Sequence, residues 1–288
     1  MEEIELQRQQ IEKSILKTYK FTIWNKFIKA IKQYQLIKEN DKICVCISGG
    51  KDSMLMAKLF MHLHQYSEIP FEVKYLVMDP GYNPINLQII KNNLQILGIP
   101  ATIVQTNIFE VANSQIESPC YLCAKMRRGA LYRLAKDLGC NKIALGHHYD
   151  DVIETTLMNM LNAGSFQTML PKLHSDNFPG MEVIRPMYLI REKDIINFKN
   201  YNNLTFIQCA CRFTEQCGIC DNGGGGSMRY KTKKLIQDLV KDYSPVVEKC
   251  IFRAASNANI DMLLGYKQEG KMHSFLDDYD SKTGRNKE

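Results

Sequence analysis

The sequence predicts an α/β protein built on a Rossmann-like parallel sheet with helices on both faces. Short apolar runs of strand character, such as residues 42–48, alternate with stretches whose apolar residues recur every three or four positions. One such helical stretch ends at Gly98, and Pro100 follows it, which is typical of a helix C-terminus. Strands that alternate with helices form right-handed βαβ units, and these units build parallel sheets.

The elements are expected in a regular order along the chain. Strands are expected at residues 42–48, 71–79, 101–106, 141–147 and 181–187, and helices at 51–66, 83–98, 123–139, 150–164, 191–204 and 228–243. We divide the chain into an N-terminal helical extension (1–40), a nucleotide-binding α/β domain (41–208), a Cys-rich loop with a C-terminal helical region (209–275) and a disordered tail (276–288). The GGGGS stretch at 223–227 lies in the Cys-rich loop and looks like a linker.

Charge and hydropathy exclude some classes of protein. The 37 basic and 31 acidic residues give a net charge of +6, which permits an anionic partner such as tRNA without requiring one. No apolar run is long enough for a membrane-spanning helix, and the charged N-terminus lacks the apolar core of an export signal. We therefore expect a cytoplasmic protein with no membrane partner.

The cysteines fall into groups. Ten are present: Cys120 and Cys123 form a C-x-x-C pair, while Cys209, Cys211, Cys217 and Cys220 form a dense second group. Cys44 and Cys46 lie in an apolar run and are expected to pack in the core. In a reducing compartment, clustered cysteines bind metal or carry out chemistry more often than they form disulfides. From the residues alone, the C-x-x-C pair is compatible with zinc, an iron–sulfur cluster, a redox couple or a disulfide.

Residues 48–53, SGGKDS, carry the clearest signal for a bound anion. They lie between a predicted strand and a predicted helix, where free N–H groups and the helix dipole favour phosphate. Gly49 and Gly50 permit a tight turn, and Ser48 and Ser53 supply hydroxyl groups. Lys51 adds a positive charge, and Asp52 suggests either Mg²⁺ or a capping role. The spacing differs from the Walker A loop, and the alternative is a tight turn with a good helix cap.

Other polar residues follow the second and fourth predicted strands, and the carboxyl ends of parallel strands share one edge. Met78 ends the second strand, where its backbone is a candidate contact for adenine. Gly146 permits close approach of the fourth strand to a nucleotide, and Asp150 and Asp151 are candidates for catalysis or for helix capping. Arg127 and Arg128 follow the cysteine pair and are candidates for phosphate binding, with a solvated helix face as the alternative.

These motifs together resemble one known family. SGGKDS after a strand looks like the loop of the PP-loop ATP pyrophosphatase superfamily, whose members cleave ATP to AMP and pyrophosphate and adenylate a substrate. The segment CYLCAKMRRGALYRLAKDLGCNKIALGHHYDDVIETTLMNML at 120–161 and RPMYLIREKDI at 185–195 are similar to the TtcA-like tRNA 2-thiocytidine synthetase group of that superfamily. The resemblance covers most of residues 20–265.

The resemblance implies an ATP-dependent tRNA sulfurtransferase. The implied substrate is a cytidine of the tRNA anticodon loop, and the implied cofactors are Mg²⁺ and a [4Fe–4S] cluster with one iron left open for sulfide. The cluster ligands that match are Cys120, Cys123 and Cys211, with Cys209 as the second choice. Together with Asp52, Asp150 and Asp151, these cysteines form the catalytic set. The C-x-C spacing of Cys209 and Cys211 departs from the C-x-x-C of the group.

Three points stay open at this stage. Cys217 and Cys220 are extra and suit a separate zinc site, a four-cysteine site or a persulfide. The sulfur source is either sulfide or a donor protein such as a cysteine desulfurase, and a homodimer is a candidate assembly. Two alternatives to the implied function are the same chemistry on another tRNA base or a small nucleobase-like compound, and a zinc-stabilised nucleotide sensor without turnover.

Overall fold

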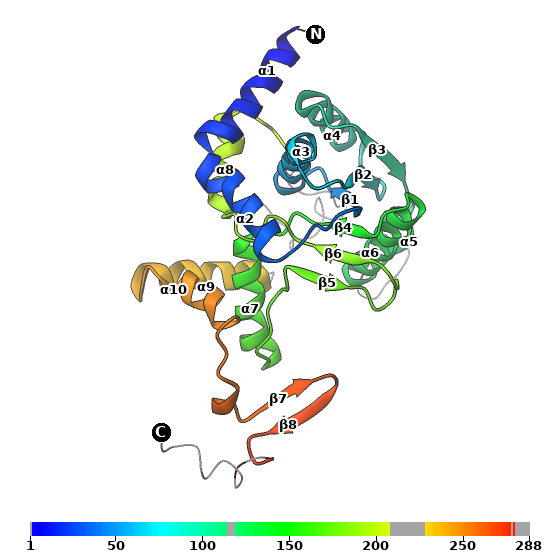
Figure 1. The fold of residues 1–288 in the computed structure, drawn as a ribbon. Coiled ribbons are helices and arrows are strands. Elements are labelled where there is room, and N and C mark those ends of the chain that lie inside the picture. The colour runs from blue at the N-terminus through cyan, green and yellow to red at the C-terminus, as the bar shows by residue number, and fades with distance from the viewer. Residues whose placement is uncertain (1, 114–118, 208–227, 278, 280–288) are drawn as a thin grey trace.

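A computed structural model describes residues 2–113, 119–207, 228–277 and 279 of the chain (Figure 1). The secondary-structure elements follow the predicted alternation. They are α1 Glu2–Lys13, η1 Ser14–Thr18, η2 Lys20–Trp24, α2 Asn25–Gln33, β1 Lys42–Ile47, α3 Lys51–Tyr66, β2 Glu72–Asp79, α4 Pro84–Leu97, β3 Ala101–Gln105, α5 Ile108–Asn113, α6 Pro119–Asp137, β4 Lys142–Ala144, α7 Tyr149–Ala163, β5 Lys172–His174, β6 Glu182–Ile184, α8 Glu192–Tyr201, α9 Met228–Asp242, α10 Val247–Ala254, η4 Ile260–Met262, β7 Gly265–Gln268 and β8 Lys271–Ser274.

A six-stranded sheet forms the centre of the molecule, and it confirms the predicted fold class. Its strand order is β3-β2-β1-β4-β6-β5. All neighbouring strands pair in parallel except β5 and β6, which pair antiparallel. The antiparallel edge strand β5 was not predicted, because it has three residues and none of them is buried. From β1 the chain moves outward through β2 and β3, and it then returns to β4 on the other side of β1. This reversal places the binding crevice of such a sheet at the carboxyl ends of β1 and β4.

The core surrounds the central strand. Five of the six residues of β1 are buried, as the apolar run predicts, and Cys44 and Cys46 pack in the core as expected. The N-terminal segment also belongs to this core, since Ile11, Ile23 and Phe27 are fully buried in the main cluster. It is not one continuous α-helix: two π-helical turns, η1 and η2, interrupt it between α1 and α2.

The C-terminal region departs from the prediction in part. Helices α9 and α10 pack against α7, in agreement with the helical pattern. Residues 265–274 form the β7–β8 hairpin and not a helix, so the prediction of a helical region is wrong there. The turn explains the difference, because Glu269 and Gly270 both have positive φ angles, as a tight hairpin turn requires. In Figure 1 the hairpin extends away from the sheet.

The structure does not describe most of the predicted Cys-rich loop and tail. The described residues do not include the GGGGS stretch, most of the predicted tail or the cysteines of the Cys-rich loop, which are Cys209, Cys211, Cys217 and Cys220.

Of the helices that the structure describes, none has the length and apolar character needed to span a bilayer.

Candidate functional site

The loop between β1 and α3 is shaped by its glycines. Gly49 has a φ angle of +86°, and a Cβ atom there would lie 2.7 Å from side-chain atoms of Ile90 and Ile207. Only glycine satisfies both the conformation and the space. Gly50 is the N-cap of α3, and in the part of the chain that the structure describes no side chain caps this end of the helix. The first-turn N–H groups of α3 are therefore open to an anion at the crevice of the sheet.

Hydroxyl groups hold this loop in place. The Ser53 hydroxyl accepts a hydrogen bond from the Ser48 N–H and donates to the Gly50 carbonyl, both at 3.1 Å. The Tyr82 hydroxyl donates to the Ser48 carbonyl at 3.1 Å, a contact that the sequence analysis missed. Tyr82 is positioned in turn by Asp79, whose Oδ1 accepts the Tyr82 N–H at 2.7 Å. Loops from β1 and β2 thus meet at one edge, as predicted.

Met78, the candidate adenine contact, has its side chain in the hydrophobic core and is 3% exposed. The side chain is therefore not available to a nucleotide, and the predicted backbone contact at the end of β2 stays a prediction. Gly146 follows β4 and lies beside the start of α3, and its predicted approach to a nucleotide stays a prediction. A Cβ atom there would lie 3.1 Å from the Ser53 backbone nitrogen, so glycine lets the end of β4 approach the start of α3.

The aspartate pair that follows β4 has two distinct sets of partners. The Asp151 side chain accepts the His148 N–H at 2.9 Å and completes a capping box at the start of α7. Its other oxygen lies 2.8 Å from Arg229. Asp150 accepts the Glu192 N–H at 2.7 Å and pairs with Arg191 at 3.0 Å. Asp150 therefore joins α7 to α8, while Asp151 caps α7 and faces α9.

Asp52 keeps one oxygen available. Its Oδ2 accepts a hydrogen bond from Lys51 at 3.1 Å. Its Oδ1 is buried and accepts no hydrogen bond from the described part of the chain, and it lies 3.9 Å from His148 Nε2. His147, next to His148, has a pKa lowered to about 4 by burial, so its ring is neutral near pH 7. A carboxylate oxygen with no partner beside an open helix N-terminus suits a divalent cation that accompanies phosphate.

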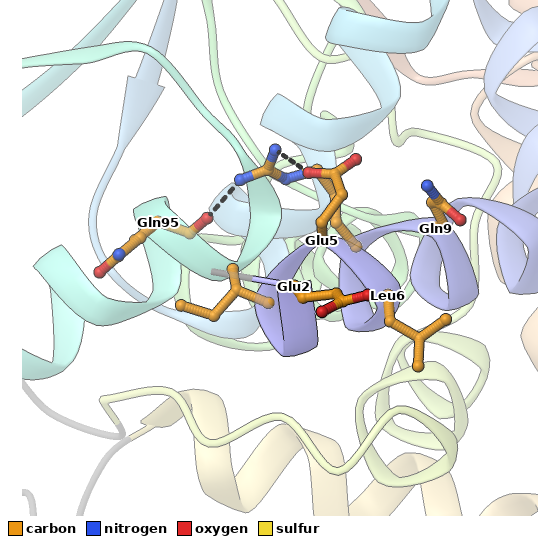
Figure 2. Close-up of a pocket in the computed structure, with 7 residues that line it drawn as sticks. Glu2, Glu5, Leu6, Gln9 and Gln95 are labelled. Atoms are coloured by element: carbon orange, nitrogen blue, oxygen red, sulfur yellow. Dashed lines mark hydrogen bonds and ion pairs between the residues drawn. The ribbon is translucent and has the colours of Figure 1, made fainter.

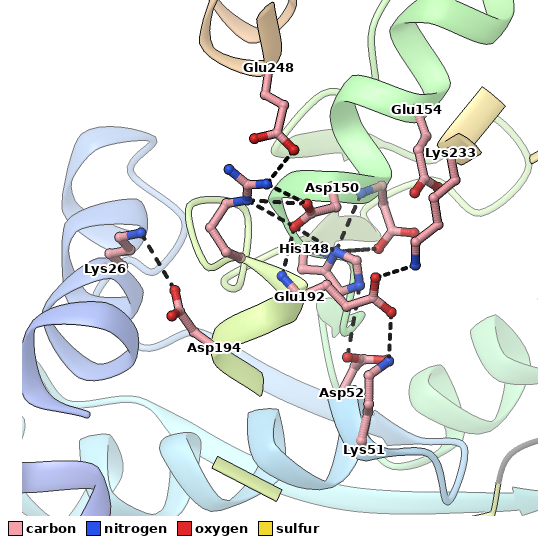
Figure 3. A network of polar contacts seen from close by, with 12 residues as sticks. Lys26, Lys51, Asp52, His148, Asp150, Glu154, Glu192, Asp194, Lys233 and Glu248 are labelled. Carbon is pink, nitrogen blue, oxygen red and sulfur yellow. Dashed lines mark hydrogen bonds and ion pairs between the residues drawn. The ribbon is translucent and has the colours of Figure 1, made fainter. Parts of the chain in front are cut away.

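Charged residues from α8 and α9 join Asp150 and Asp151 at the edge of the crevice, and we call this set of side chains the rim (Figure 3). Glu192 lies between two lysines: it accepts a hydrogen bond from Lys51 at 3.2 Å and another from Lys233. Burial opposes the charge of Glu192, but the Lys233 hydrogen bond and the Lys51 charge prevail and lower its pKa to about 2. Arg229, one turn before Lys233 on α9, contacts both Asp151 and Glu154.

Glu192, Arg229 and Lys233 were not predicted to lie at the nucleotide site. Glu192 belongs to the REKDI motif, and the basic segment 229–234 suggested contacts with RNA phosphates or a solvated helix face, but the two segments are 37 and more residues apart in the sequence. Burial raises the pKa of Glu154 to about 6, although the neighbouring Arg229 opposes the shift.

The two arginines of α6 lie near the rim. Burial raises the pKa of Tyr82, and the charge of Arg127 opposes this rise, so Arg127 is close to the phenol that holds the loop. Arg128 is exposed, and its charge contributes to the lowered pKa of Arg185, after burial. Arg127 and Arg128 are thus within electrostatic range of Tyr82 and Arg185, respectively.

The predicted cluster ligands are only partly covered by the structure. Cys120 and Cys123 lie one turn apart at the start of α6, and Cys123 is buried. Among the residues with a described placement, no group of three or more His, Cys, Asp or Glu side chains is arranged to hold a metal ion. Because Cys209 and Cys211 are outside those residues, the ligand set stays a prediction.

A surface hollow of about 670 Å³ lies elsewhere, between α1 and α4 (Figure 2). Glu2, Glu5, Leu6, Gln9 and Gln95 are among its lining residues, and Arg8 joins Glu5 to the Gln95 carbonyl. Gln95 lies near the C-terminus of α4, whereas α4 begins beside the rim. The hollow is therefore at the opposite edge of the sheet from the loop, and we do not assign it to the site.

Comparison with known proteins agrees with this geometry. The family model described as a PP-loop domain matches residues 21–211. The chain is 36% identical over 246 residues to a tRNA-cytidine(32) 2-sulfurtransferase of Citrifermentans bemidjiense, covering 84% of this chain and 92% of that protein. It is also 36% identical over 232 residues to the protein of the same name from Vibrio cholerae, covering 80% of this chain and 71% of that protein.

The fold is also found among solved structures. The U34-tRNA thiolase NcsA from Methanococcus maripaludis, determined with its [4Fe–4S] cluster, superimposes with a TM-score of 0.62 at 22% sequence identity. The match covers 81% of this chain and 76% of NcsA. The sheet order, the loop at the carboxyl end of β1 and the length of the matches lead to one assignment: the chain belongs to the PP-loop family and, within it, to the group of tRNA-cytidine(32) 2-sulfurtransferases.

Proposed function

We propose that this protein is an ATP-dependent tRNA sulfurtransferase that converts a cytidine to 2-thiocytidine and releases AMP and pyrophosphate. The observation that carries the proposal is the SGGKDS loop, which presents the uncapped N-terminus of α3 at the crevice between β1 and β4. The relatives named tRNA-cytidine(32) 2-sulfurtransferase, which match over most of their length, supply the substrate class.

The loop binds the phosphates of ATP. First-turn amides of α3 and the hydroxyl group of Ser48 donate hydrogen bonds to the phosphate oxygens, while the Ser53 hydroxyl holds the loop through its bonds to Ser48 and Gly50. Lys51 neutralises charge that develops on the leaving pyrophosphate. Asp52 Oδ1, which lacks a partner among the described residues, is the oxygen that we assign to Mg²⁺.

The reaction proceeds in two displacements. The cytidine O2 attacks the α-phosphorus of ATP, and the bond from that phosphorus to the bridging oxygen breaks, releasing pyrophosphate. Hydrosulfide then adds to C2, and the C2–O2 bond breaks as AMP leaves with O2. The hydrosulfide proton must go to a base, and we assign it to Asp151, which capping by His148 and pairing with Arg229 hold at the rim.

A [4Fe–4S] cluster is the cofactor that we propose, held by Cys120, Cys123 and Cys211, with Cys209 as the alternative third ligand. Thiolates are the usual ligands of such clusters, and Cys120 and Cys123 lie one turn apart on α6. When bound through three protein ligands, the cluster would supply an iron at which external sulfide is presented for transfer. The NcsA structure was determined with a cluster of this type, which supports the choice over zinc.

A thiolation assay tests the reaction. Unmodified tRNA is incubated anaerobically with the reconstituted protein, Mg·ATP and sulfide, and its nucleosides are separated by mass. The proposal predicts 2-thiocytidine with the wild type and a loss of at least a hundredfold with Asp151→Asn. A thiolated base other than cytidine would change the substrate, and no thiolated nucleoside despite a loaded cofactor would overturn the proposal. A cysteine desulfurase with cysteine replaces sulfide in a parallel reaction to identify the donor.

Metal analysis tests the cofactor separately. Iron, zinc and acid-labile sulfide are measured after anaerobic purification of the wild type and of Cys123→Ser. About four iron and four sulfide per chain, lost in the variant, is the expected result for the cluster. Stoichiometric zinc without sulfide would exclude the cluster and favour the zinc-stabilised alternative.

A further inference from the structure

Two lysines share one carboxylate at the SGGKDS loop (residues 48–53), which we call the phosphate loop. Lys51 Nζ lies 3.2 Å from Glu192 Oε1, and Lys233 Nζ contacts the other oxygen, Oε2. Figure 3 shows the three side chains in a continuous set of contacts that reaches Asp52. The charge of Lys51 also acts on Lys233, as expected for ammonium groups on either side of a single carboxylate. Lys233 therefore lies beside the loop although it is 182 positions away in the sequence.

The helix that carries Lys233 is firmly attached to the rim. Thr232 and Ile236 of α9 are buried, and they anchor the helix against its neighbours. Arg229, four residues before Lys233, fixes the same face of α9 by contacts of 2.8 Å with Asp151 and 3.2 Å with Glu154. Lys233 is thus held in place by packing and by its helix, while 42% of its side chain remains exposed to solvent.

The charges of Lys51, Asp52, Glu192 and Lys233 cancel when no ligand is bound. Lys51 and Lys233 carry two positive charges, and Asp52 and Glu192 carry two negative charges. A divalent cation on the open oxygen of Asp52 would compensate that carboxylate and leave the lysines in excess. The excess positive charge would then face the phosphates at the N-terminus of α3.

We propose that Lys233 is a second phosphate-binding cation of this site, positioned by Glu192 opposite Lys51, and that it binds the pyrophosphate portion of ATP. The C-terminal segment then contributes directly to a site that is otherwise built by the α/β domain. This inference rests on the proposed use of the loop for ATP phosphates. It assigns Lys233 to the pyrophosphate and not to the transferred adenylate, because its partner Glu192 bridges it to Lys51 of the loop.

Binding of inorganic pyrophosphate tests this assignment without the reaction. Isothermal titration calorimetry with Mg²⁺ and pyrophosphate compares the wild type with Lys233→Gln, Lys233→Arg and Lys241→Gln. Lys241 lies on the same helix and is 82% exposed, so its replacement controls for the change in net charge. We expect Lys233→Gln to weaken binding about tenfold or more, Lys233→Arg to remain within about threefold of the wild type, and Lys241→Gln to have no effect.

The outcomes separate this inference from the proposed function. Equal affinities for Lys233→Gln and Lys241→Gln, in a protein that binds pyrophosphate, would overturn the role of Lys233 alone. Lack of pyrophosphate and ATP binding by the wild type would count against the proposed function itself. If Lys233→Gln and Lys233→Arg weaken binding equally while their unfolding curves match the wild type, the positive charge is not what matters, and the assignment is wrong.

Discussion

The phosphate loop and the charged rim beside it are built in different ways. The loop consists of six consecutive residues, and its proposed function depends on backbone conformation and on the absence of a side chain at Gly49. The rim consists of side chains from α7, α8 and α9, joined by ion pairs around Asp150, Asp151 and Glu192 (Figure 3). A backbone site tolerates almost no substitution, whereas a network of partly exposed pairs loses energy in smaller steps. Substitutions in the loop and in the rim should therefore differ in the size of their effects.

Gly49→Ala should have the largest effect. The added methyl group is incompatible with a φ angle of +86° and with Ile90 and Ile207 at 2.7 Å, so the loop must move. We expect ATP-dependent AMP release to fall at least about a hundredfold, equivalent to about 2.7 kcal/mol. Gly180→Ala is the matched control, because Gly180 also has a positive φ angle but no atom lies within 4 Å of its added Cβ. Equal activity in the two variants would show that the crowded loop is not required.

Arg191→Gln should mainly affect stability. Arg191 connects Asp150 of α7 with Glu248 of α10, at 3.0 and 2.5 Å, and its guanidinium lies 5.0 Å from the centre of the Tyr149 ring. We expect the free energy of unfolding to fall by about 2 kcal/mol in urea titrations. Arg253→Gln on the exposed side of α10 serves as the control and should change it by less than about 0.5 kcal/mol. A similar loss in both variants would mean that the rim does not hold α10.

Glu192→Gln should separate substrate binding from catalysis. Both lysines lose a charged acceptor, and Lys51 then pairs with Asp52 alone. The expected result is a KM for ATP raised about tenfold with kcat within about twofold of the wild type. Glu68→Gln, at an exposed position outside the rim, should leave both constants unchanged. A variant with lower kcat at unchanged KM would instead place Glu192 in the chemical step.

Glu154→Gln should show the smallest effect, and that effect should depend on pH. The folded-state pKa of Glu154 is about 6, above its usual value of 4.5, because the side chain is buried. Its protonation therefore stabilises the folded protein below about pH 4.5, and this contribution disappears as the pH rises through 6. Relative to the wild type, the variant should gain on the order of 1 kcal/mol between about pH 4.5 and pH 7.5 in urea unfolding. A difference that is independent of pH would contradict the shift.

These two regions also differ in how far the sequence predicted them. SGGKDS, Gly146 and the α/β order were recognisable because a strand, a glycine turn and a helix start are local patterns. The pairing of Glu192 with Lys233 depends on how α8 and α9 pack, and no local pattern encodes it. The same reason explains why β5 was not predicted, because its three residues are held as a strand by pairing with β6. The Glu269–Gly270 turn, in contrast, was a local signal for the hairpin that the sequence analysis did not use.

The coupling of adenylation to sulfur transfer can be measured in a single experiment. AMP and thiolated nucleoside are quantified in the same anaerobic reaction of wild-type protein, tRNA, Mg·ATP and sulfide. If adenylation at the phosphate loop activates the cytidine for sulfur transfer, one AMP appears for each 2-thiocytidine, and Gly49→Ala lowers both products together. Formation of 2-thiocytidine without AMP, or AMP release that continues without tRNA thiolation in a cofactor-loaded protein, would contradict the account.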